Sequence, residues 1–174
     1  MLNKMFLKRN IRSSFIKGIS YTTRPKRPNE KNGRDYYFVD KKTFRKLIKD
    51  DFFLEHQKVL EDYYGTPKYF LERARSKGKD LILCIDVKGG MYLKKNVKRD
   101  KIVTIFISAP TAQELSQRLR KRGDFAILKK RIALAKKELQ FVKVYDYLII
   151  NQNIKKAMSL LEAVLIAERL RRDR

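Results

Sequence analysis

The chain has 174 residues, of which 43 are Lys or Arg and 19 are Asp or Glu, so its formal net charge is +24. This length suits one domain, and the 43% of apolar residues are spread along the chain, which excludes a disordered basic tail. One cysteine, Cys84, and one histidine, His56, exclude a disulfide framework and a zinc site built on Cys or a His cluster. No window of 18 apolar residues occurs, so we expect no membrane span.

The elements expected in chain order are a helix at about 2–9, strands over Phe15–Tyr21 and Tyr36–Val39, a helix over Lys41–Lys49, a strand over Phe52–Glu55, a helix from Pro67 to Lys77, strands over Leu81–Ile85 and Lys101–Ile107, helices at about 111–120 and 125–142, a strand over Tyr147–Ile150 and a helix at about 154–171. Continuous apolar runs such as Leu81–Ile85 are typical of strands buried on both faces of a parallel sheet. The alternation favours an α/β fold with a largely parallel sheet, to which a smaller antiparallel lobe at about 34–64 is attached.

The positive charge attracts polyanions such as nucleotides, nucleic acids and acidic membrane surfaces. The basic residues recur in short runs, such as Lys94-Lys95 and Arg171-Arg172, mostly on the outer faces of the expected helices. No RNA-recognition, KH or zinc-knuckle signature accompanies them. We therefore favour solvated surface charge over a dedicated nucleic-acid interface, and we rank nucleic-acid binding last among the candidate functions.

Two arginines lie three residues apart on a loop that contains Pro25 and Pro28 and follows the first expected strand. The loop runs from about 22 to 34, and its prolines favour extended backbone over helix. Arg24 and Arg27 can therefore direct two planar guanidinium groups at one phosphate. Either arginine alone would be interpreted as a surface residue.

Glu55 ends an apolar run, Phe52-Phe53-Leu54, soon after the aromatic motif Gly33-Arg-Asp-Tyr36-Tyr-Phe. A carboxylate in that place can accept hydrogen bonds from N1–H and the 2-amino group of guanine, whereas adenine offers an acceptor at N1. The plainer alternative is an exposed acid at the end of a strand, which the residue in isolation would favour.

The segment Tyr63-Tyr64-Gly65-Thr66-Pro67 places hydroxyl groups and a glycine before an expected helix. Glycine allows close approach of the backbone, and a hydroxyl at a helix start can bind a base or a phosphate. A turn followed by a helix N-cap is the more frequent meaning of such a segment in isolation.

Taken together, these segments resemble the guanylate kinase family. The motifs are S-x-T-T-R-x-x-R from Ser20, G-x-D-Y-x-F from Gly33, F-x-E ending at Glu55, and Y-G-[ST] from Tyr64. The resemblance covers essentially the whole chain, from Leu2 to about Arg169. It implies one domain over 1–174 with a P-loop-kinase-like parallel sheet, flanking helices, a GMP-binding lobe at about 34–64 and a lid at about 120–132.

The resemblance implies transfer of a phosphoryl group from ATP to GMP, with Mg²⁺ accompanying ATP, in the cytoplasm. By motif, Arg24, Arg27, Tyr36 and Tyr64 would hold the GMP phosphate, and Ser20, Glu55, Thr66 and Asp86 would surround guanine. On the ATP side, Arg122 and Asn151 would bind the nucleotide. Arg24, Arg122 and Arg131 would act in catalysis. No residue is assigned as a metal ligand, and the sequence leaves the oligomeric state open.

The family's phosphate-binding loop, G-x-x-x-x-G-K-[ST], does not occur in this sequence, because none of the seven glycines fits the pattern. That loop surrounds the ATP phosphates with backbone N–H groups and a lysine. Leu2 to Met5 align with the helix that follows it, so we expect a fold that lacks the first strand and the P-loop. Either the loop is encoded upstream or it has been lost. Cys84 stands where the family usually has an Asp near the metal.

We therefore expect this chain alone to phosphorylate GMP slowly or not at all. The alternative, from a different class, is a catalytically inactive module that binds GMP or a protein partner, as guanylate kinase-like domains of scaffolding proteins do. The nearly complete set of GMP residues favours the enzyme family, because a peptide-binding module need not retain them.

Overall fold

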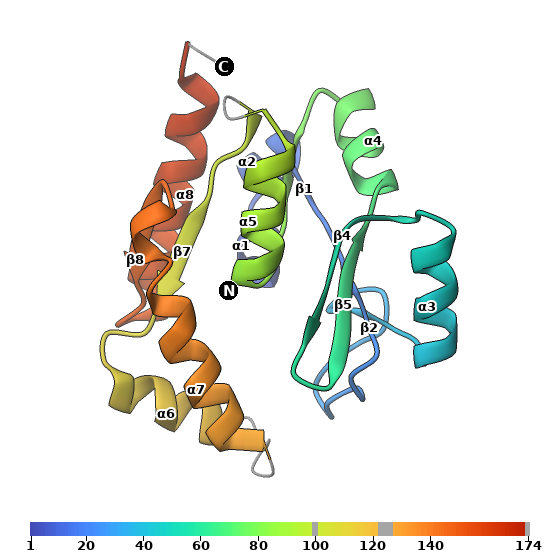
Figure 1. Cartoon of the computed structure of the whole chain (residues 1–174). Coiled ribbons are helices and arrows are strands. Elements are labelled where there is room, and N and C mark those ends of the chain that lie inside the picture. The colour runs from blue at the N-terminus through green and yellow to red at the C-terminus, as the bar shows by residue number, and fades with distance from the viewer. Residues whose placement is uncertain (99–100, 122–126, 173–174) are drawn as a thin grey trace. The chain divides into compact units, whose positions relative to one another are not determined.

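The computed structural model describes residues 1–98, 101–121 and 127–172. The chain divides into two compact units, Leu2–Leu93 and Lys94–Arg174, the second together with Met1. Each unit contains a parallel pair of strands with helices against it, and the first unit carries a further four-stranded sheet (Figure 1). The expected α/β fold with parallel strands and flanking helices is confirmed.

The first unit contains the helices α1 (Leu2–Met5), α2 (Arg9–Ser14), α3 (Lys41–Lys49), α4 (Tyr69–Ser76) and most of α5 (Val87–Asn96). Its strands are β1 (Phe15–Lys17), β2 (Tyr21–Thr22), β3 (Tyr37–Phe38), β4 (Phe53–Val59), β5 (Asp62–Pro67) and β6 (Asp80–Ile82). The second unit contains β7 (Ile105–Ser108), α6 (Ala112–Arg120), α7 (Leu128–Leu139), the 3₁₀ helix η3 (Val142–Val144), β8 (Tyr147–Ile150) and α8 (Ile154–Leu170).

The four-stranded sheet has the order β3-β2-β5-β4, and β4 and β5 form an antiparallel hairpin. Helix α3 packs against β4, as Figure 1 shows. Its fully buried Phe44 stacks on Phe53 of β4 and on Tyr63 of β5, with ring centroids 4.7 and 5.5 Å away. This aromatic packing fixes the hairpin register, in which Glu55 lies opposite Thr66.

Strands β1 and β6 pair in parallel, and helices α2 and α4 pack against them. The predicted single strand over Phe15–Tyr21 is wrong, because the chain leaves β6 after Gly18 and enters the four-stranded sheet at Tyr21. Gly18 donates its N–H to Ile82 O at 2.9 Å, and a Cβ there would lie 2.5 Å from Leu83 Cδ2. A side chain at this change of sheet would therefore displace Leu83.

Several predicted elements are confirmed. The helix over Lys41–Lys49 and the strand over Tyr147–Ile150 have the predicted bounds. Thr111 caps α6, because its hydroxyl accepts from Glu114 N at 3.1 Å, as the capping motif indicates.

Other expectations are wrong. The opening helix is divided into α1 and α2, since no helix is assigned at residues 6–8. The segment Tyr63–Pro67 lies in strand β5 and not at a turn before a helix, because pairing with β2 and β4 satisfies its backbone. Strand β6 ends at Ile82 and is half-buried, with β1 as its one neighbour in the described sheets. Within the described ranges, no helix is long and apolar enough to cross a bilayer.

Candidate functional site

Three side chains of the first unit form a buried hydrogen-bond chain. Glu55 on β4 and Thr66 on β5 are paired across the hairpin, and Ser20 immediately precedes β2, which pairs with β5 on its other side. Thr66 Oγ1 donates to Glu55 Oε1 at 2.7 Å and lies 3.0 Å from Ser20 Oγ. Because a hydroxyl has one proton and Thr66 gives it to Glu55, Ser20 is the donor to Thr66. The sheet therefore orients all three groups before any ligand arrives.

A second carboxylate lies beside Glu55 at the start of α5. Asp86 Oδ1 accepts from Gly89 N at 2.7 Å, so it caps the helix as an N-terminal acceptor. Burial raises the pKa of Glu55 to about 7; the charge of Asp86 adds to this increase, while the bond from Thr66 opposes it. Burial also raises the pKa of Asp86. Two neighbouring carboxylates, one buried (Glu55) and one half-buried (Asp86), suit a ligand edge that carries N–H donors.

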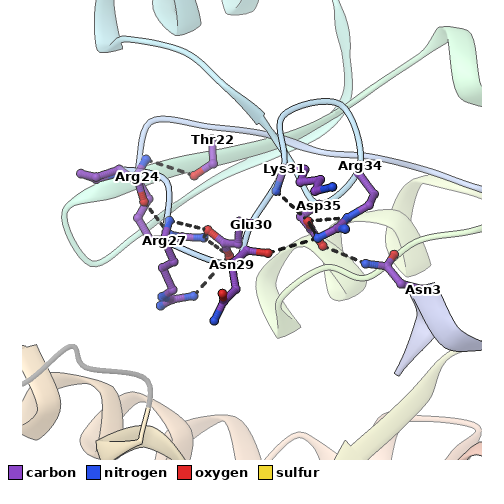
Figure 2. Close-up of polar contacts among 10 residues, drawn as sticks. Asn3, Thr22, Arg24, Arg27, Asn29, Glu30, Lys31, Arg34 and Asp35 are labelled. Atoms are coloured by element: carbon purple, nitrogen blue, oxygen red, sulfur yellow. Dashed lines mark hydrogen bonds and ion pairs between the residues drawn. The ribbon is translucent and has the colours of Figure 1, made fainter.

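An arginine cluster lies on the loop after β2 (Figure 2). Arg24 is 7% exposed, and its Nη2 donates to Glu30 Oε1 at 2.8 Å and to Oε2 at 3.0 Å. Arg27 Nη1 lies 3.6 Å from the same Oε1 atom. Burial would lower the pKa of Arg24, but its hydrogen bond to Glu30 and the charge of that carboxylate raise it above its ordinary value. The two arginines thus meet at the carboxylate of Glu30.

Two tyrosines border the arginine cluster. The Tyr36 ring lies 5.5 Å from the guanidinium carbon of Arg24, and its centroid is 6.0 Å from that of Tyr64. Burial raises the pKa of Tyr36 to about 12, so its hydroxyl keeps its proton as a hydrogen-bond donor at neutral pH. Tyr36, Tyr64 and the two arginines therefore combine phenolic and cationic donors in one region.

The remaining predicted residues belong to the other unit. Arg131 lies in α7, and Asn151 follows β8, where its N–H donates to Ser108 O at 2.8 Å and its carbonyl accepts from Arg118 Nη2 at 2.7 Å. Arg122 lies outside the described residues. The assignment of these three residues to ATP and catalysis stays a prediction.

Glu30 and Gly89 have roles in the geometry that the sequence motifs did not assign. Glu30 follows Arg24 by six residues and Arg27 by three, and it is the first acid of the chain. An acid in an otherwise basic, proline-containing loop is the signal that could have identified it. The sequence contains no comparable indication for Gly89, because Glu55, which it contacts in space, lies 34 residues earlier in the chain.

One unit of this parallel-strand α/β fold therefore holds two neighbouring carboxylates, Glu55 and Asp86, and a cluster of two arginines. The family model described as guanylate kinase matches residues 1–168. The chain belongs to the guanylate kinase family.

Individual relatives agree with this assignment. The chain is 42% identical over 160 residues to a guanylate kinase of Koribacter versatilis (strain Ellin345), which covers 89% of this chain and 68% of the relative. It is 40% identical over 162 residues to a guanylate kinase of Wolbachia pipientis wMel, with coverage of 92% and 80%. The crystal structure of guanylate kinase from Anaplasma phagocytophilum superposes with a TM-score of 0.82 at 32% identity, covering 99% of this chain and 82% of that one.

Proposed function

We propose that the chain binds GMP as the phosphoryl acceptor of an ATP-dependent reaction that yields GDP and ADP. The observation that carries the proposal is the placement of Ser20 and Arg24 around β2. Ser20 precedes this two-residue strand and is hydrogen-bonded, through Thr66, to Glu55. Arg24 follows the strand and belongs to the arginine cluster. The four residue steps from Ser20 to Arg24 span at most about 13 Å in an extended chain, which suits an elongated ligand with a base at one end and a phosphate at the other.

Guanine fits the acidic end by hydrogen-bond polarity. Its N1–H and 2-amino groups are donors, and ionised Glu55 and Asp86 are acceptors. Adenine would place its N1 acceptor against a carboxylate, and the two acceptors would repel. At the other end, Arg24 and Arg27 supply cationic donors and Tyr36 and Tyr64 supply hydroxyl donors for the phosphate.

In the proposed reaction, a phosphate oxygen of GMP forms a bond to the γ-phosphorus of ATP while the bond from that phosphorus to the β–γ bridging oxygen breaks. Negative charge spreads over the transferred group, so positively charged donors lower the barrier. We assign this role to Arg24, Arg122 and Arg131, and we place Asn151 at the adenine.

Mg²⁺ would enter with ATP, since it usually retains waters and binds substrate phosphates with one or two carboxylates. Among residues 1–98, 101–121 and 127–172, no group of three or more His, Cys, Asp or Glu side chains gathers as a ligand set. We treat the ion as part of the ATP substrate. The reaction would belong to purine nucleotide metabolism, and we place it in the cytoplasm.

Calorimetry with GMP and AMP tests the acceptor assignment. We expect GMP to bind at least roughly tenfold more tightly than AMP, because a site built around hydrogen-bond acceptors discriminates against a base that lacks the donors. Equal affinity for the two nucleotides would refute the assignment. A coupled assay of ADP release with GMP, ATP and Mg²⁺ measures turnover, and it also tests the prediction that this chain alone is slow.

A further inference from the structure

Glu30 lies between the two arginines of the proposed phosphate site (Figure 2). Both of its carboxylate oxygens accept from Arg24 Nη2, and Oε2 also accepts from the backbone N–H of Arg27 at 2.9 Å. The Glu30 N–H in turn donates to Arg27 O at 3.0 Å. One side chain therefore fixes the guanidinium of Arg24 and the backbone of Arg27 together.

The charge arrangement explains why such a residue is needed. Two guanidinium groups directed at one point repel each other, and Arg24 is buried, so an uncompensated charge there would be costly. Glu30 Oε1 faces both groups, at 2.8 Å from Arg24 Nη2 and 3.6 Å from Arg27 Nη1. It offsets the repulsion and leaves one net positive charge on the three residues.

We propose that Glu30 is a positioning residue that holds Arg24 and Arg27 in the geometry that receives the nucleotide phosphate. The inference rests on the proposed function, because it takes GMP as the ligand. Arg24 Nη1 is held from a second direction by Pro25 O at 2.6 Å, so the plane of its guanidinium is set from two sides. A preset pair of donors loses less conformational entropy on binding than two free arginines would.

A second acid of the same loop provides a matched control. Asp35 accepts from Lys31 N at 2.9 Å, from the Arg34 guanidinium and from Asn3 Nδ2 at 2.8 Å. These contacts are made with Lys31, Arg34 and Asn3 (Figure 2), and none of them involves Arg24 or Arg27. Replacing Asp35 with Asn therefore removes one acidic charge from the same loop without touching the arginine cluster.

The experiment compares the affinities of GMP and guanosine for wild type, E30Q and D35N by calorimetry. Gln keeps the volume of Glu30 but loses its charge, and its amide nitrogen cannot accept from Arg27 N–H. We expect E30Q to bind GMP roughly tenfold more weakly, since hydrogen bonds to charged groups are involved, and guanosine with unchanged affinity. D35N should bind both ligands as wild type does.

Each other outcome overturns the inference. Tighter GMP binding by E30Q would mean that Glu30 competes with the phosphate, and equal losses for GMP and guanosine would mean a general structural role. Unchanged GMP affinity would leave Glu30 without a role in phosphate binding. If wild type does not bind GMP more tightly than guanosine, the proposed function itself fails. Where E30Q gives too little folded protein, E30D, which draws the charge back by one methylene, should lose GMP affinity in the same direction.

Discussion

The carboxylate of Glu55 lies against the backbone of Gly89, so that a Cβ at position 89 would be 2.7 Å from Glu55 Oε2 and 3.3 Å from Asp86 Oδ1. Any side chain at position 89 would require the Glu55 carboxylate to move. This close approach brings β4 and the start of α5 together at the two carboxylates of the proposed guanine site.

The substitution G89A should therefore damage the guanine end of the site. The added methyl group would displace Glu55, and overpacking of this kind costs about 1–3 kcal/mol. We expect GMP affinity to fall roughly tenfold or more by calorimetry. The control is K95A, an exposed position on the same helix, which should bind GMP as wild type does. Unchanged GMP affinity in G89A would show that Glu55 does not read the base.

The raised pKa of Glu55 predicts how stability changes with pH. The folded protein binds the Glu55 proton with a pKa of about 7, against an ordinary value of 4.5, so the folded state holds more protons between these values. Stability contributed by this group is complete below about pH 4.5 and is lost as the pH rises to about 7. We expect wild type to lose unfolding free energy relative to E55Q over this window. Urea unfolding of both proteins from pH 4 to pH 8 measures it, and a constant difference would contradict the prediction.

GMP binding should show the opposite trend at low pH, because the proposed site needs ionised Glu55. Affinity is expected to decrease as the pH falls below about 7, by about tenfold per pH unit once Glu55 is mostly protonated. In T66V, Glu55 loses the hydroxyl that donates to its ionised form, so its pKa should rise. The acid limb of the profile, that is, the decrease of GMP affinity on acidification, should therefore begin at a higher pH. Calorimetry over pH 5–9 measures the limb.

The control for this pH profile is T23V. Thr23 directly follows β2, and its hydroxyl contacts Asp62 and accepts from Tyr63 N, away from Glu55. Its acid limb should coincide with that of wild type. A limb that is unmoved in T66V would argue that Thr66 does not act through Glu55.

Asp146 should stabilise the second unit. It accepts from Thr104 N at 2.8 Å, from Thr104 Oγ1 at 2.6 Å and from Lys94 Nζ at 3.0 Å, and so joins the starts of β7 and β8 to the end of α5. We expect D146N to lower the free energy of unfolding by about 1–2 kcal/mol, a value reduced by partial solvent screening. Thermal unfolding measures this loss, and D51N, which removes an exposed ion pair with Lys68, should change little.

The same residue should give an acid-dependent loss of stability. Burial would raise the pKa of Asp146, but its hydrogen bonds from Thr104 and the charge of Lys94 hold it below the usual value of 3.8. Its contribution is therefore complete above that value and is lost as the pH falls through the lower, folded-state pKa. The difference between wild type and D146N should shrink on acidification toward pH 3. A difference that is independent of pH would assign the effect to packing alone.

The family and many of the elements could be predicted from the sequence. The bounds of Lys41–Lys49, the cap at Thr111 and the strand Tyr147–Ile150 depend on apolar periodicity and on contacts within a few residues, which a linear pattern contains. The arginine pair was visible for the same reason, because Arg24 and Arg27 are neighbours on one loop.

The hydrogen bonds that join Ser20, Thr66 and Glu55 were decided by the tertiary structure alone. Ser20 and Thr66 are 46 residues apart, and Thr66 contacts Glu55 because two strands pair in one register. Register depends on how Phe44 and its aromatic neighbours pack, so no local pattern specifies it. Composition and spacing determined which side chains are available in this chain. The packing of β2, β4, β5 and α5 decided which of these side chains form hydrogen bonds with one another and which charged groups lie close together.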